Sequence, residues 1–128
     1  MATSKVNHIE HYTRKLLWSN TGAISAGTVI NLSSSDYDEL EIHYTSEGTA
    51  TAPIYDARCE KGRDVYLTHY QVTMNNTSDT FIMCRHLTRN SDTKFTADAG
   101  LIYRMSGAFL QGPLFALPLK IYGIKYIT

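Results

Sequence analysis

The strongest constraint on the fold is a seven-residue run, Glu39 to Thr45, in which apolar and polar side chains alternate. Its apolar members are Leu40, Ile42 and Tyr44. Successive side chains of a β-strand point to opposite faces of the sheet, so this run predicts a strand with one buried and one solvated face. Because a slip of one residue would bury Glu41, we expect the register to be strongly specified.

Short runs rich in Val, Ile, Thr and Tyr recur along the chain, separated by clusters of Gly, Asn, Asp and Ser. No window after the N-terminal segment has an apolar stripe of helical period. We therefore predict an all-β fold, an antiparallel, jelly-roll-like β-sandwich of about eight strands. Besides residues 39–45, the expected strands span 16–18, 28–32, 54–59, 64–74, 80–88, 94–96, 101–105 and 117–127.

The longest expected hairpin joins residues 64–74 to residues 80–88. In its first arm both alternating sets contain large side chains, which are Val65 and Leu67 on one side and Tyr66, Tyr70, Val72 and Met74 on the other. This pattern predicts a strand that is covered on both faces. Residues 107–113 are predicted to be a loop, although they include Phe109 and Leu110.

A chain of 128 residues is long enough for one domain with an ordinary core. We predict that residues 1–13, which are polar, form an N-terminal arm, and that residues 14–128 form the β-sandwich domain. The arm carries His8 and His11 with helical H-x-x-H spacing, but no further ligand lies in register. No metal site is predicted there.

The 12 basic and 12 acidic residues cancel, so no large uniform field steers the chain toward nucleic acid or anionic lipid. No apolar stretch has the length of a signal-peptide core or a membrane span. We expect no nucleic-acid and no membrane partner. Association with another protein, or with further copies of this chain, fits the zero net charge better, because self-repulsion is absent.

Sequence motifs for chemistry are weak. Ser33 to Ser35, the histidines and the aspartates supply the residue types of a hydrolase, but no G-x-S-x-G elbow or glycine-rich phosphate loop is present. The acidic residues Asp36, Asp38, Glu39 and Glu41 lack the rhythm of a calcium-binding loop and are interpreted as a turn that enters a strand. We predict that the protein is not an enzyme and needs no cofactor.

Nine tyrosines are the more informative feature, because tyrosine serves both core packing and recognition. Tyr12, Tyr37 and Tyr55 lie in or beside expected loops and are the candidates for contact with a ligand or an interface. Cys59 and Cys84 lack the close spacing of a zinc or redox site and are predicted to be buried thiols, with a disulfide left open.

Several stretches resemble small virion proteins of tailed bacteriophages, including fibre tips and head or tail appendage domains. They are KLLWSN from Lys15 to Asn20, LSSSDYDELEI from Leu32 to Ile42, RNSDTKFT from Arg89 to Thr96, and LKIYGIK from Leu119 to Lys125. The resemblance covers most of residues 15 to 125, and the phrases mark strand ends and core positions.

This resemblance implies a β-sandwich subunit, commonly a homotrimer, that is made in the host cytoplasm and exposed on the virion. Its roles there would be decoration of the head or tail, or attachment to the host surface, with a host glycan as a candidate ligand. Only about a dozen residues precede Arg14, where a full fibre has a long shaft, so a stand-alone decoration or fibre-tip subunit is expected. The arm would contact other virion proteins. The alternative is a free carbohydrate-binding module.

Overall fold

The computed structural model describes residues 11–46, 52–72 and 80–127. These ranges form ten strands and no helix, so they contain no helix that could cross a membrane. The strands are β1 (Tyr12–Ser19), β2 (Val29–Asn31), β3 (Glu39–Thr45), β4 (Ile54–Glu60), β5 (Val65–Gln71), β6 (Phe81–Ser91), β7 (Lys94–Ala97), β8 (Gly100–Arg104), β9 (Phe109–Gly112) and β10 (Leu117–Tyr126). The predicted all-β fold is confirmed.

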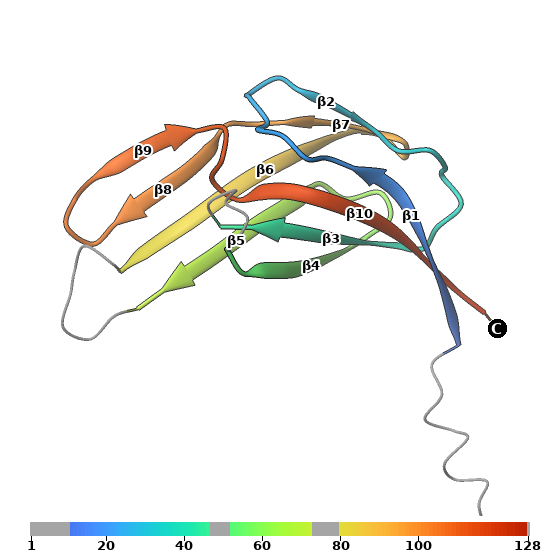
Figure 1. Ribbon diagram of the computed structural model, residues 1–128. Helices are drawn as coiled ribbons and strands as arrows, with labels where there is room; N and C mark the ends of the chain where they lie inside the picture. Colours follow the sequence, from blue (N-terminus) through green and yellow to red (C-terminus); the bar gives the residue numbers. More distant parts are fainter. Residues whose placement is uncertain (1–10, 47–51, 73–79, 128) are drawn as a thin grey trace, which may run out of the picture.

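The strands form two antiparallel sheets. The smaller sheet has the order β1-β10-β3-β4. The larger sheet has the order β2-β7-β6-β8-β9, with β5 on the other side of β6. Strands β7 and β8 both pair with β6, one with each half, and are separated by Asp98 and Ala99. In Figure 1 the larger sheet curls around the smaller one, and the β8–β9 hairpin extends past the smaller sheet at the end opposite the C-terminus.

The core fills the space between the two sheets. Leu40 and Ile42 of β3 face it from the smaller sheet, and Leu67, Met83 and Leu87 face it from the larger one; all five are at most 1% exposed. The strand predicted from the alternation at residues 39–45 is present with those bounds. Its polar face holds one surprise, since Glu41 is also buried, at 7% exposed.

Aromatic side chains connect the two sheets at the side where β4 and β5 approach. The rings of Tyr55 on β4 and His69 on β5 stack with centroids 3.9 Å apart. The hydroxyl of Tyr44 donates a hydrogen bond of 2.8 Å to the carbonyl of Thr68. These contacts fix the distance between the sheets and cover part of the β5 edge.

Two boundaries differ from those expected. Residues 109–112 form the strand β9 instead of a loop, because Gly107, with φ of 98°, permits a tight turn that returns the chain along β8. The arm is also shorter than expected, since Tyr12 and Thr13 pair with Tyr126 and Lys125 in the smaller sheet. Residues 1–10 of the expected arm lie outside the described residues, and His8 is among them.

Candidate interaction surface

A row of large side chains crosses the outer face of the larger sheet. Tyr70 on β5 lies opposite Ile82 on β6, Ile82 lies opposite Tyr103 on β8, and Tyr103 lies opposite Phe109 on β9. Each of these four side chains is 47% to 69% exposed. Residues opposite one another on adjacent strands share a face, so the four form one continuous apolar row. The rings of Tyr103 and Phe109 are in contact, with centroids 4.8 Å apart.

The alternation of β5 explains why this face is apolar. Val65 and Leu67 point into the core, so Tyr66 and Tyr70 must point out, and they are 67% and 69% exposed. The prediction that this strand is covered on both faces is wrong for the single chain: the described residues cover one face only. Strand β5 therefore has large side chains on both faces but buries only one, and the other face leaves an apolar surface exposed, of the kind that often marks an interaction site.

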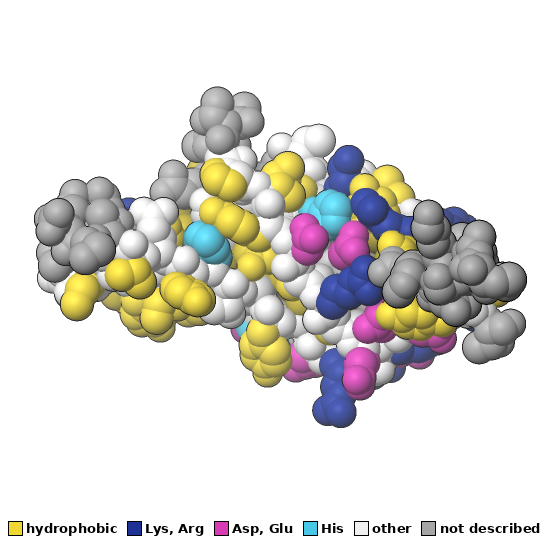
Figure 2. Space-filling model, turned by 90° about the horizontal axis from the view of Figure 1, so that it is seen from below, with side chains coloured by type: hydrophobic (Ala, Val, Ile, Leu, Met, Phe, Trp, Pro, Cys, Tyr) yellow, Lys and Arg dark blue, Asp and Glu magenta, His cyan; other side chains and the backbone are white. Residues whose placement is uncertain are grey.

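The same face carries no acidic side chain and no lysine or arginine over four of its strands. The outward positions of β5, β6, β8 and β9 are Tyr66, Thr68, Tyr70, Ile82, Cys84, His86, Thr88, Leu101, Tyr103, Phe109 and Gln111. His86 marks the border of this uncharged area, since its ring lies 2.8 Å from Asp64 and 3.3 Å from Asp98. Figure 2 shows hydrophobic side chains gathered toward the end with the β8–β9 hairpin and charged ones toward the other end.

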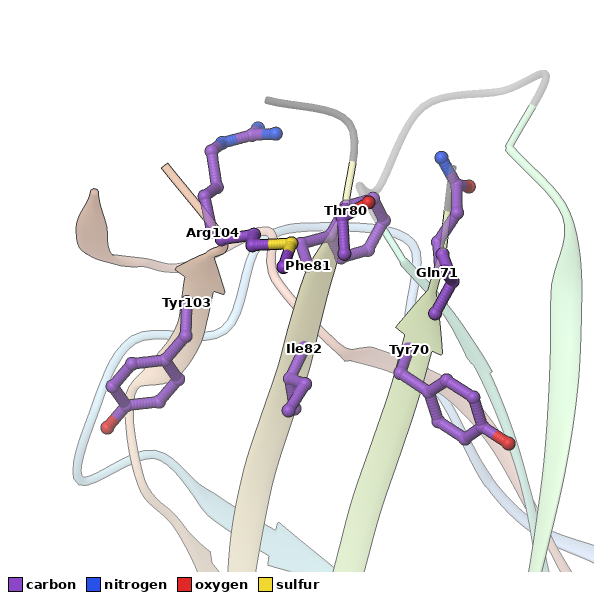
Figure 3. Close-up of a pocket in the computed structure, with 9 residues that line it drawn as sticks. Tyr70, Gln71, Thr80, Phe81, Ile82, Tyr103 and Arg104 are labelled. Carbon is purple, nitrogen blue, oxygen red and sulfur yellow. The ribbon is translucent and has the colours of Figure 1, made fainter. Parts of the chain in front are cut away.

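A hollow of about 400 Å³ opens where β5 and β8 end and β6 begins. Val72, Phe81 and Met105 contribute to its lining, beside Tyr70, Ile82 and Tyr103 of the row. In Figure 3 the side chains of Tyr70 and Tyr103 diverge on either side of Ile82. Gln71, Thr80 and Arg104 complete the lining, and a hollow of this size with a mostly apolar lining can accept apolar side chains of a partner.

The outer face of the smaller sheet is polar by contrast. The carboxylate of Glu41 lies 2.8 Å from His43 Nε2, 3.2 Å from Arg58 and 3.4 Å from Arg14. Burial alone would raise the pKa of Glu41, but the hydrogen bonds from His43 and Arg58 and the charge of Arg14 outweigh it and lower that pKa. The Arg14 guanidinium also lies 3.9 Å from the ring centroid of Tyr122. This network satisfies its own charges and covers Glu41.

The three candidate tyrosines lie in different surroundings. Tyr37 is 2% exposed and its hydroxyl donates a 2.5 Å hydrogen bond to the carbonyl of Asp92, so this side chain belongs to the core and offers no surface to a ligand. Burial raises the pKa of Tyr37 to about 12. Tyr55 is half-buried in its stack on His69. Tyr12 packs edge-on against Tyr126. The structure brings no two of them together.

The acidic residues of the expected turn are engaged by groups of the chain itself. Asp36 pairs with Lys125 at 2.5 Å, and Asp38 accepts a hydrogen bond from the backbone of Tyr126. Glu39 lies 3.6 Å from Arg58. Within the described ranges no three His, Cys, Asp or Glu side chains converge as a metal site would require.

Both cysteines are free and only partly buried. Cys59 lies on β4 and Cys84 on β6, so they belong to different sheets. Burial raises the pKa of the Cys59 thiol to about 11, which leaves it protonated at neutral pH. Neither the spacing nor the environment supports a redox role.

Sequence reasoning missed Arg85, which is 2% exposed at the break between β7 and β8. Its guanidinium donates hydrogen bonds of 2.8 to 3.2 Å to the carbonyls of Ile24, Asp98, Pro113, Phe115 and Ala116. Burial lowers the pKa of Arg85 to about 10, so it remains charged at neutral pH. The sequence did contain a signal for its burial, because Arg85 alternates in phase with Met83 and Leu87, which face the core from β6. Its role is structural, since it ties three loops to one strand.

Comparison with known proteins gives no relative from which a function could be transferred. No protein-family model, no curated protein and no solved structure matches this chain.

Proposed function

We propose that this protein is a non-catalytic structural subunit that associates with further copies of itself through the outer face of the larger sheet. The row formed by Tyr70, Ile82, Tyr103 and Phe109 carries the proposal, because monomeric proteins rarely leave such a large apolar surface in contact with water. The outward side chains around the row on β5, β6, β8 and β9 are uncharged, so two copies that meet through this face bring no like charges together.

The size of the face limits how much of an interface it can supply. Strands β5, β6, β8 and β9 together have 27 residues. With the rise per residue and the spacing of strands in a sheet, their outer face measures about 430 Å². A stable protein–protein interface buries roughly 800 Å² on each partner. The face therefore supplies about half of a specific contact, and the hollow beside Val72 and Met105 is a further place for apolar side chains of the second copy.

We further propose that the assembly belongs to a bacteriophage virion, as a decoration or fibre-tip subunit. The support is the resemblance of the sequence phrases. Three of them fall on β1, β10 and the segment that leads into β3, which are neighbouring strands of the smaller sheet. Such phrases describe a shared scaffold and assign no receptor-binding residue. The homotrimer, the host glycan and the arm's contact to other virion proteins stay predictions.

A matched pair of variants tests the self-association. Ile82→Lys places a charge in the row at a position that is 51% exposed, and Ile54→Lys places the same charge on the smaller sheet at a position that is 60% exposed. We expect light scattering after size exclusion to give the same multiple of 14.4 kDa for the wild type and for Ile54→Lys, and a smaller multiple for Ile82→Lys. A wild type that stays at 14.4 kDa at high concentration would refute the proposal.

The alternative, a free carbohydrate-binding module, loses one of its motivating residues, because Tyr37 is buried. A glycan array with the wild type and Tyr55→Ala distinguishes the two functions. Binding that disappears in Tyr55→Ala would favour the carbohydrate module, and no binding would leave the structural role as the better account.

A further inference from the structure

Strand β9 is an edge of the larger sheet. Its residues Phe109 to Gly112 pair with β8 on one side, and no described strand pairs with the other side. The β8–β9 hairpin extends past the smaller sheet, so its open side is not covered by that sheet in Figure 1. A backbone edge of this kind is a template for another extended strand.

The hydrogen-bond phase of the hairpin identifies which backbone groups face outward. The amide of Arg104 donates to the carbonyl of Ala108 at 2.9 Å, which makes these two residues a hydrogen-bonded pair. Bonded and non-bonded pairs alternate along an antiparallel ladder, so Leu110 bonds to Ile102. The N–H and C=O groups of Phe109 and Gln111 then point to the open side.

This edge lacks the charges that both outer strands of the smaller sheet carry. The outer strand β1 carries Arg14 and Lys15, and the outer strand β4 carries Asp56 and Arg58. From Met105 to Leu119 the sequence has no charged residue at all. Phe109 and Leu110, which point to opposite faces of β9, are each 50% exposed. Natural edges that stay free are usually protected by charge, proline or a bulge, so this one fits a partner strand.

We propose that β9 pairs in antiparallel orientation with β9 of a second copy, about a two-fold axis at Leu110. Phe109 of each copy would then exchange two backbone hydrogen bonds with Gln111 of the other, so that all the outward groups of β9 are satisfied. Leu110 would face Leu110 of the second copy, which buries both side chains. The occupant is a second copy because the edge is self-complementary and uncharged, and because pairing brings the two half-exposed Leu110 side chains together.

This inference goes beyond the proposed function, since pairing of two β9 edges leaves the outer face of the larger sheet free for the face-to-face contact. A two-fold contact is isologous and gives even-numbered assemblies. It therefore builds dimers, or joins two trimers if the expected homotrimer forms through another part of the surface.

Disulfide trapping tests the pairing. In a non-hydrogen-bonded antiparallel pair the Cα atoms lie about 4.5 Å apart, within the range that a disulfide spans. Leu110→Cys should therefore form a covalent dimer under diamide oxidation. The matched control is Leu114→Cys, at a position that is 42% exposed and follows β9, and the wild type corrects for Cys59 and Cys84. We expect Leu110→Cys to cross-link at least about tenfold faster, because pairing raises the local thiol concentration.

A second substitution shows whether the backbone edge is responsible. Gln111→Pro removes an outward N–H without touching the bonds to β8, whereas Gln111→Ala keeps it. Cross-linking through Leu110→Cys should fall to the control rate with Gln111→Pro and persist with Gln111→Ala, while circular dichroism shows that each variant is folded. Equal rates for Leu110→Cys and Leu114→Cys would overturn the inference. If the wild type is then still oligomeric, only the β9 pairing fails; if it is monomeric, the proposed function fails as well.

Discussion

Arg85 and Gly100 fit together so closely that a Cβ atom on Gly100 would lie 2.8 Å from Arg85 Nη2. The same Cβ would collide with the carbonyl oxygens of Phe115 and Gly112. Gly100 begins β8, directly after the break that Arg85 fills. The break between β7 and β8 therefore depends on two residues. Gly100 has no side chain that would fill the space, and Arg85 on β6 supplies five N–H donors to the carbonyls around the break.

Gly100→Ala should destabilise the protein. The new methyl group meets backbone oxygens that cannot move aside easily, and it displaces the Arg85 guanidinium from its carbonyls. We expect a loss of about 3 kcal/mol in the free energy of unfolding, measured by urea denaturation. Gly22→Ala is the control, because no described atom lies within 4 Å of its Cβ. Equal midpoints for the two variants would show that the close fit is not required.

Arg85→Met should cost at least about 3 kcal/mol, because it leaves buried carbonyls without donors. Arg85→Lys should recover little of this loss, since an ammonium group cannot reach carbonyls on opposite sides of the cage. Arg63→Met, at a side chain that is 74% exposed, should change the stability by no more than about 0.5 kcal/mol. A small effect of Arg85→Met on the urea midpoint would contradict the structural role of the cage.

Tyr37→Phe should cost about 1 kcal/mol at neutral pH, because the partly buried carbonyl of Asp92 loses its donor. The pKa of Tyr37, raised by burial to about 12, adds a pH dependence. The protonated phenol stabilises the fold fully below the ordinary value of 10, and this contribution is lost as the pH rises toward 12. Wild type should therefore lose more stability in this window than Tyr37→Phe. The exposed Tyr66→Phe should follow the wild type.

Glu41→Gln should lower the stability by about 2 kcal/mol at pH 7, since it removes the charge that His43, Arg58 and Arg14 surround. The pKa of Glu41 lies below its ordinary value of 4.5. Its carboxylate therefore stabilises the fold above that value, and the contribution is lost as the pH falls through the folded pKa. Urea midpoints should fall more steeply with acid for the wild type than for Glu41→Gln. The exposed Glu60→Gln serves as the control.

The sequence predicts those parts of the fold in which side chains alternate regularly. Residues 39–45 have the expected bounds, and Val65 and Leu67 point into the core as the pattern requires. The sequence did not predict strand β9, because the strand has only four residues and carries apolar side chains on both faces, so no alternation is visible. The pair Ser106 and Gly107 before it is typical of a three-residue hairpin turn and could have indicated the strand.

The candidate site was harder to predict, because side-chain direction in irregular segments has no period. Tyr37 follows a serine-rich turn, and nothing in the sequence shows that it points inward. Arg85 lies in phase with the buried Met83 and Leu87, but its five acceptors come from residues 24, 98, 113, 115 and 116, whose convergence only the folded chain reveals. The apolar row could not be predicted without the strand order, since Tyr70, Ile82 and Tyr103 become neighbours only when β5, β6 and β8 pair.

The most direct test of the account is surface labelling of the wild type at increasing protein concentration. Carbene footprinting, read by mass spectrometry, reports the exposure of individual side chains. We expect labelling of Tyr70, Ile82 and Tyr103 to fall as the chain associates, while labelling of the equally exposed Ile54 on the smaller sheet stays constant. Constant labelling of the row at concentrations where the chain is oligomeric would show that another surface makes the contact and would contradict the central claim.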